Sequence, residues 1–135
     1  MTQAPRGRPI WATLAALVAL VFGALTIASG GRVLFGSEAA RASAGYYVPF
    51  VVWFNFLAGF AYVAAGAGLW YWQRWSAWLA LVIAGATALV FAAFGLHVAG
   101  GGEFEARTVA AMTLRTVLWS AIAAQSLWAF RAAPA

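Results

Sequence analysis

Four long apolar runs, separated by short polar breaks, are the feature that most limits what this chain can fold into. A helix of about 20 apolar residues matches the ~30 Å hydrocarbon core of a bilayer. The polar breaks place the predicted spans at about residues 9–29, 47–72, 75–99 and 108–130. A helix satisfies its backbone hydrogen bonds internally, as a membrane demands. The sequence therefore predicts an all-α fold, an antiparallel bundle of four transmembrane helices that takes in residues 1–135 as a single domain.

The composition supports a membrane protein and excludes several kinds of chemistry. Of 135 residues, 65% are hydrophobic and only 8% are charged, far from the balance of a soluble domain. There is no cysteine. Disulfides, thiolate metal sites and thiol redox chemistry are therefore excluded.

The basic residues of the chain are all arginines, and they indicate topology rather than nucleic-acid binding. The net charge is +5, but the arginines are spread over the connections instead of forming a basic stripe, so no nucleic-acid partner is expected. Under the positive-inside rule, the cytoplasmic ends are those that carry most arginine and no acidic residue. Those ends carry Arg6, Arg8, Arg74 and Arg131. We therefore expect a multi-pass protein with both termini in the cytoplasm.

The longest polar break lies between the first two spans, from Gly30 to Gly45. Within it, Ser37 is typical of a helix N-cap and Gly45 of a helix end. These signals predict a short surface helix over residues 38–42. Pro49 suits the first turn of the span that follows, where its missing N–H costs no hydrogen bond.

Small residues on the second span predict how the helices pack. In lipid, helices associate through close approach of small side chains. Asn55, Gly59, Tyr62 and Gly66 recur on one face, and a second stripe follows around the helix. This stripe consists of Ala61, Ala65 and Gly68. The second span is therefore expected to pack on two neighbours, either at the centre of one bundle or in a bundle that also dimerises.

Arg115 is the charged residue that lies inside a predicted span. A cation at the centre of a membrane helix costs about 2.5–3.5 kcal/mol, so Arg115 should face protein or water. Such a residue either marks a functional site or extends its guanidinium to the interface. Gln125, further along the same span, is predicted to form a hydrogen bond between helices.

The candidate site is a polar pocket near the outer surface, and two interpretations of it stay open. The pocket would consist of Asn55, Tyr62, His97, Glu103, Glu105, Arg107 and Arg115. In one interpretation these residues bind a ligand. In the other, Glu103 or Glu105 pairs with Arg107 or Arg115, and the charges only hold the third and fourth spans in register.

Catalysis is not expected from these residues. The chain has no aspartate and no cysteine, and its serines lie in no catalytic motif. His97 is the only histidine, so it falls short of the ligand set of a metal site and, within one subunit, of the paired histidines of a transmembrane haem. A haem shared by two subunits stays open. The sequence thus predicts no metal and leaves any other cofactor unassigned.

The glycine-rich second span and the segment after it resemble the DoxX-like group of small four-helix membrane proteins. The resemblance rests on the chain length, the number of spans, and Gly59, Gly66, Gly68, Leu69, Arg74 and the alanine-rich segment 75–80. It implies a protein of the inner (cytoplasmic) membrane. Some members of the group are accessory subunits of quinone-linked redox systems.

The expected function is that of a noncatalytic membrane protein, which either self-associates as a homo-oligomer or serves as an accessory subunit of a larger membrane complex. One alternative is a small transporter or channel, although transport favours polar residues through the whole depth of the membrane. A second alternative is a redox module that binds a quinone or lipid, with His97 or Tyr62 as hydrogen-bond partner.

Overall fold

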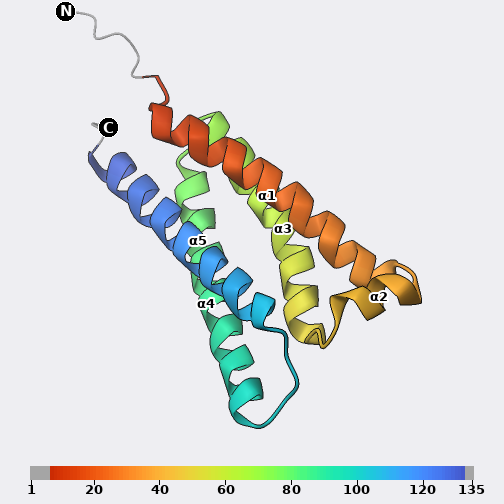
Figure 1. The fold of residues 1–135 in the computed structure, drawn as a ribbon. Helices are drawn as coiled ribbons and strands as arrows, with labels where there is room; N and C mark the ends of the chain where they lie inside the picture. The colour runs from red at the N-terminus through yellow and green to blue at the C-terminus, as the bar shows by residue number, and fades with distance from the viewer. Residues whose placement is uncertain (1–6, 133–135) are drawn as a thin grey trace, which may run out of the picture.

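The computed structural model describes residues 7–132, so that Arg6 lies outside the described residues. In this part of the chain every regular element is an α-helix, which confirms the all-α prediction (Figure 1). The helices are α1 (Ile10–Phe35), α2 (Glu38–Ala44), α3 (Pro49–Trp70), α4 (Trp75–Ala99) and α5 (Ala106–Ala132). Three of them, α1, α3 and α4, are long and apolar enough to cross a membrane. These three helices indicate a membrane protein.

Helix α5 corresponds to the predicted fourth span, and it differs in polarity from the other three long helices. Its 27 residues are enough for a span, yet it is not among the helices apolar enough to count as one. Its sequence includes Arg115, three threonines, two serines and Gln125, which lower its hydropathy. The bundle of four transmembrane helices therefore stays a prediction.

Helix α1 is longer than the sequence predicts. The expected break at Gly30 is wrong, because α1 continues through Gly30 and Gly31 to Phe35. At Gly30 the helix lies so close to α3 that an added Cβ would lie 3.0 Å from the Cβ of Phe56. Gly30 therefore serves close helix packing instead of ending the helix.

The connection from α1 to α3 follows the prediction. The Ser37 hydroxyl accepts a hydrogen bond from the N–H of Ala40 at 3.2 Å and caps α2. Gly45, with a φ of 70°, ends α2 in a conformation that favours glycine. The short surface helix is thus confirmed, two residues longer than predicted.

Helix α3 packs against both α1 and α4, as its two stripes of small residues predict. An added Cβ at Gly59 would lie 2.7 Å from Cγ1 of Ile27 and 3.2 Å from the carbonyl oxygen of Gly23. On the other side, an added Cβ at Gly68 would lie 2.7 Å from the Cβ of Ser76 on α4. The two faces bring both neighbours close to the backbone of α3.

The long helices are connected as antiparallel neighbours, and α5 packs mainly on α4. Figure 1 shows that α3 and α4, packed with α1 and α5 respectively, diverge from their connection toward the end of the molecule that carries α2. Between them, the core is filled by Tyr62 and Trp119, which are fully buried with ring centroids 4.8 Å apart. The divergence of the two helix pairs leaves room for the site.

Candidate functional site

Arg115 lies within α5 and is 8% exposed. Its Nη1 donates a hydrogen bond of 3.1 Å to the hydroxyl of Thr26 on α1. Its Cζ lies 4.7 Å from the ring centroid of Phe22 and 6.0 Å from that of Tyr62, within cation–π range. The Nε atom is buried and has no hydrogen-bond partner. The guanidinium therefore contacts one hydroxyl and two aromatic rings, and its Nε–H donor has no hydrogen-bond partner.

The ion pairs expected as a structural alternative are not present among the described residues. The carboxylate of Glu105 accepts a hydrogen bond of 2.8 Å from the N–H of Tyr46. The guanidinium of Arg107 donates to the carbonyl oxygens of Ser43 at 3.0 Å and Ala44 at 2.9 Å, at the end of α2. Arg115 thus keeps a buried positive charge that no described carboxylate neutralises.

A cavity of about 340 Å³ lies beside Arg115, between α1, α3 and the first half of α5. We call it the polar cavity. Its apolar walls come from residues such as Val48 and Val51, and none of the described residues that line it is acidic. Its polar lining consists of Thr26, Ser29, Tyr47, Asn55, Arg107, Thr108 and Arg115. Hydroxyls, an amide and two arginines are groups that suit an anion with polar substituents.

Four of the predicted site residues are brought together. Asn55, Arg107 and Arg115 line the polar cavity, and Tyr62 lies beneath Arg115. The Oδ1 atom of Asn55 is buried without a hydrogen-bond partner, as is the hydroxyl of Tyr62. Asn55 and Arg115, which the sequence analysis places in one pocket, thus line the same cavity.

The other three predicted site residues lie elsewhere. The Nε2 atom of His97 is 3.0 Å from the carbonyl oxygen of Glu103, in the connection between α4 and α5. Glu105 holds the start of α3 through Tyr46, and its carboxylate occupies the space that Gly45 leaves free by lacking a Cβ. His97, Glu103 and Glu105 do not line the polar cavity. The predicted pocket is thus divided between the cavity and the α4–α5 connection.

Two residues of α1 belong to the site and were missed by the sequence reasoning. Thr26 supplies the hydrogen-bond acceptor of Arg115, and Phe22 supplies the nearer aromatic ring. Thr26 is one of only three hydroxyl residues in the apolar run 9–29, which is the signal that could have found it. Nothing in the sequence distinguishes Phe22 from the other aromatic residues of the spans.

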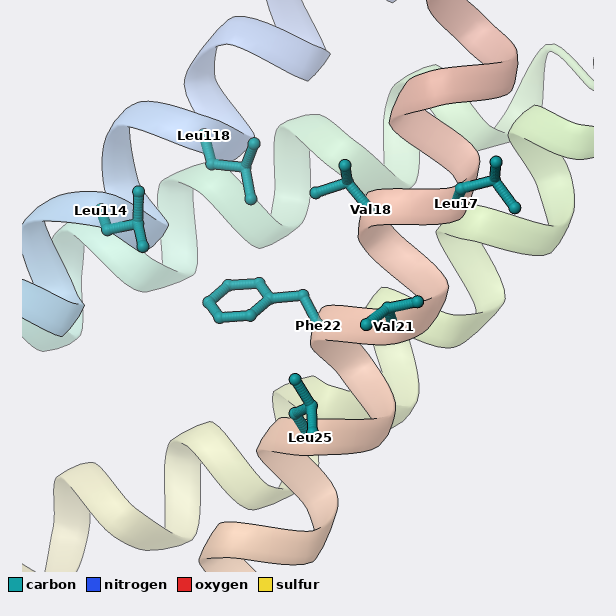
Figure 2. Close-up of a pocket in the computed structure, with 7 residues that line it drawn as sticks. All are labelled: Leu17, Val18, Val21, Phe22, Leu25, Leu114 and Leu118. Carbon is teal, nitrogen blue, oxygen red and sulfur yellow. The ribbon is translucent and has the colours of Figure 1, made fainter.

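A second hollow, of about 450 Å³, lies between α1 and α5 (Figure 2). We call it the lateral groove. It is lined only by apolar side chains, and Figure 2 shows that Phe22 and Val18 extend from α1 toward α5. The lining residues are Leu17, Val18, Val21, Phe22, Leu25, Leu114 and Leu118.

The groups available for chemistry are few. Among residues 7–132 there is no group of three histidine or acidic side chains that could hold a metal ion. Gln125 forms no hydrogen bond to another described helix of this chain, because its side chain is exposed, whereas Ser126 beside it is buried. The site can therefore bind and orient a charged group through Arg115, Thr26 and Asn55.

Comparisons of this chain with protein family models, curated proteins and solved structures find no match. The resemblance to the DoxX-like group thus stays a prediction from the number of spans and the positions of glycines.

Proposed function

We propose that this protein is a noncatalytic membrane protein whose polar cavity binds an anionic group, a phosphate or a carboxylate, at Arg115. The observation that carries the proposal is the buried guanidinium of Arg115, which borders a cavity and has no described carboxylate partner. A buried cation without a counter-ion is costly, and an anionic ligand would offset that cost. Arginine also has the planar set of donors that matches phosphate and carboxylate oxygens.

In this proposal α5 is the fourth span and both termini face the cytoplasm, in an inner membrane. At 27 residues, α5 is about 40 Å long, enough to cross the ~30 Å hydrocarbon core. Arg115, the arginine furthest from the ends of α5, faces the protein interior, where a membrane charge is tolerated. The positive-inside rule supports the orientation, since Arg8, Arg74 and Arg131 belong to one side.

The polar cavity favours binding over transport. Its polar lining is confined to the half of the molecule near α2. Beyond Arg115 the interior is filled by Tyr62 and Trp119, both fully buried and in contact. Past this layer the buried polar side chains are the small hydroxyls of Ser76 and Ser126, and neither lines the polar cavity. A transporter or channel would be supported by polar residues that continue past this aromatic layer.

Self-association, or association with a larger membrane complex, is the second candidate function, and the exposed face of α5 favours it. Ser120 and Gln125 are exposed there, next to the small side chains of Ala121 and Ala124. Small residues with interspersed hydrogen-bonding groups are typical of surfaces where membrane helices associate.

A quinone could replace the anion as ligand, since the buried hydroxyl of Tyr62 has no partner.

The binding of an anionic group is tested by thermal unfolding of the purified full chain in a mild detergent, with glycerol phosphate or octanoate added. A ligand that binds only the folded state raises the Tm as its concentration exceeds Kd. We expect at least one of the two anions to raise the Tm of the wild type, and Arg115→Met to abolish the shift. Arg32→Met is the control, because Arg32 is exposed and does not line the cavity. An equal shift in Arg115→Met and wild type, or no shift with either anion, would contradict the proposal.

A further inference from the structure

The polar cavity and the lateral groove are neighbours on the same two helices. On α5, Leu114 lines the groove and the next residue, Arg115, lines the cavity. On α1, Leu25 lines the groove and Thr26 lines the cavity. Phe22 connects the two, because it lines the groove and its ring lies under the guanidinium of Arg115. A cationic hollow therefore borders an apolar one.

The lateral groove faces the surroundings of the protein. Val18 is 47% exposed, and Val21 and Leu25 are more exposed still. Helices α1 and α5 do not pack closely against each other along this side. In a bilayer such a surface meets hydrocarbon chains. An acyl chain can enter the groove from the side.

We propose that the ligand is an anionic phospholipid, with its phosphate beside Arg115 in the polar cavity and an acyl chain in the lateral groove. This inference rests on the proposed function, because it names the ligand of the same site. The chemistry of the two hollows matches the two ends of such a molecule. The headgroup meets arginine and hydroxyl groups, and the chain meets only apolar side chains.

The order of the two hollows along the helices agrees with the orientation of a lipid in one leaflet. Arg107, in the first turn of α5, and Ala44, at the end of α2, line the polar cavity, which places the cavity near the α2 end (Figure 1). The lateral groove follows toward the middle of α1. A lipid of that leaflet has its headgroup at the interface and its chains toward the midplane.

The size and charge of the polar cavity favour a phospholipid over a fatty acid. A volume of about 340 Å³ accommodates more than a single carboxylate. A second arginine, Arg107, lines the same cavity about 12 Å from Arg115 along the helix axis. Ser29 and Asn55 also line the cavity, and a hydroxyl and an amide are groups that bind hydroxyls of a headgroup such as glycerol.

The experiment is native mass spectrometry of the full chain in detergent, with phosphatidylglycerol and phosphatidylcholine of identical acyl chains added together. We expect the wild type to retain phosphatidylglycerol about tenfold over phosphatidylcholine, because both lipids carry a phosphate but only the latter brings a choline cation next to two arginines and no described carboxylate. Arg115→Met should abolish this preference. Val18→Trp fills the groove from an exposed position and should reduce retention of phosphatidylglycerol about tenfold. Leu89→Trp, on a 75% exposed position of α4, is the matched control and should retain it.

The outcomes separate the inference from the proposed function. If Val18→Trp and a second groove variant, Val21→Trp, retain phosphatidylglycerol as wild type does while Arg115→Met does not, the groove holds no chain and only the anion site stands. If Arg115→Met retains the preference, both proposals are wrong. If the wild type forms a dimer without bound lipid and Val18→Trp is monomeric, the groove is covered by a second copy and the inference is overturned. Thermal unfolding of each variant confirms that it is folded.

Discussion

Helix α1 meets α3 on one side and faces α5 on another, and the two sides are built in opposite ways. Toward α3, Gly23, Gly30 and Gly59 bring the backbones so close that an added Cβ at any of them would crowd the facing helix. Toward α5, larger side chains such as Leu17 and Phe22 line an open groove. Glycines thus hold α1 and α3 together, whereas larger side chains leave an open groove between α1 and α5.

The largest effect is expected from breaking the close side. Gly59→Leu should lower the free energy of unfolding by about 3 kcal/mol, because its side chain would overlap Ile27 and the backbone of α1. Unfolding in a mixed detergent titration measures the loss. Gly85→Leu is the control, since nothing lies within 4 Å of an added Cβ at that position. Similar losses in both variants would show that leucine is harmful in these helices regardless of the α1–α3 contact.

A change in stability of the opposite sign is expected at Arg115, on the open side between α1 and α5. Arg115→Met should raise the free energy of unfolding by about 1–2 kcal/mol, because it replaces a buried cation that has no described counter-ion by an apolar side chain of similar length. The same titration without added lipid measures the gain. Arg32→Met, at an exposed position, should change stability by less than about 0.5 kcal/mol. A marked loss of stability in Arg115→Met would contradict this expectation and indicate that the arginine is needed for folding.

The smallest effect concerns the residue between the two hollows. Phe22→Leu removes the ring that lies 4.7 Å from Cζ of Arg115 and stacks on Tyr62 at 5.7 Å. We expect a loss of about 1 kcal/mol, the size of one cation–π contact. Phe60→Leu, at an exposed aromatic residue of α3, is the matched control. In the Arg115→Met background the effect of Phe22→Leu should shrink, and a double-mutant cycle measures the coupling. Fully additive losses would show that Phe22 and Arg115 do not interact.

The local elements could be predicted because their signals are local. Ser37 and Gly45 bound α2, and the short connection at Gln73 and Arg74 gives an antiparallel pair of helices. The end of α1 was predicted wrongly, because a pair of glycines gives the same sequence signal whether it ends a helix or packs against a neighbouring helix. The role of Gly30 depends on its contact with Phe56, a residue of another helix.

The sequence by itself determined that the chain is helical, that its apolar helices suit a membrane, and that Arg115 has to be sheltered, because hydropathy and charge are properties of each residue. Only the tertiary structure decided what shelters Arg115. It placed Thr26 and Phe22 beside the guanidinium and kept Glu103 and Glu105 away from it. The physical reason is that α1 and α5 are far apart in sequence, so that the angle between them depends on how closely α1 approaches α3 and α5 approaches α4. That angle opens the polar cavity and the lateral groove, and it cannot be predicted from the sequence of any one helix.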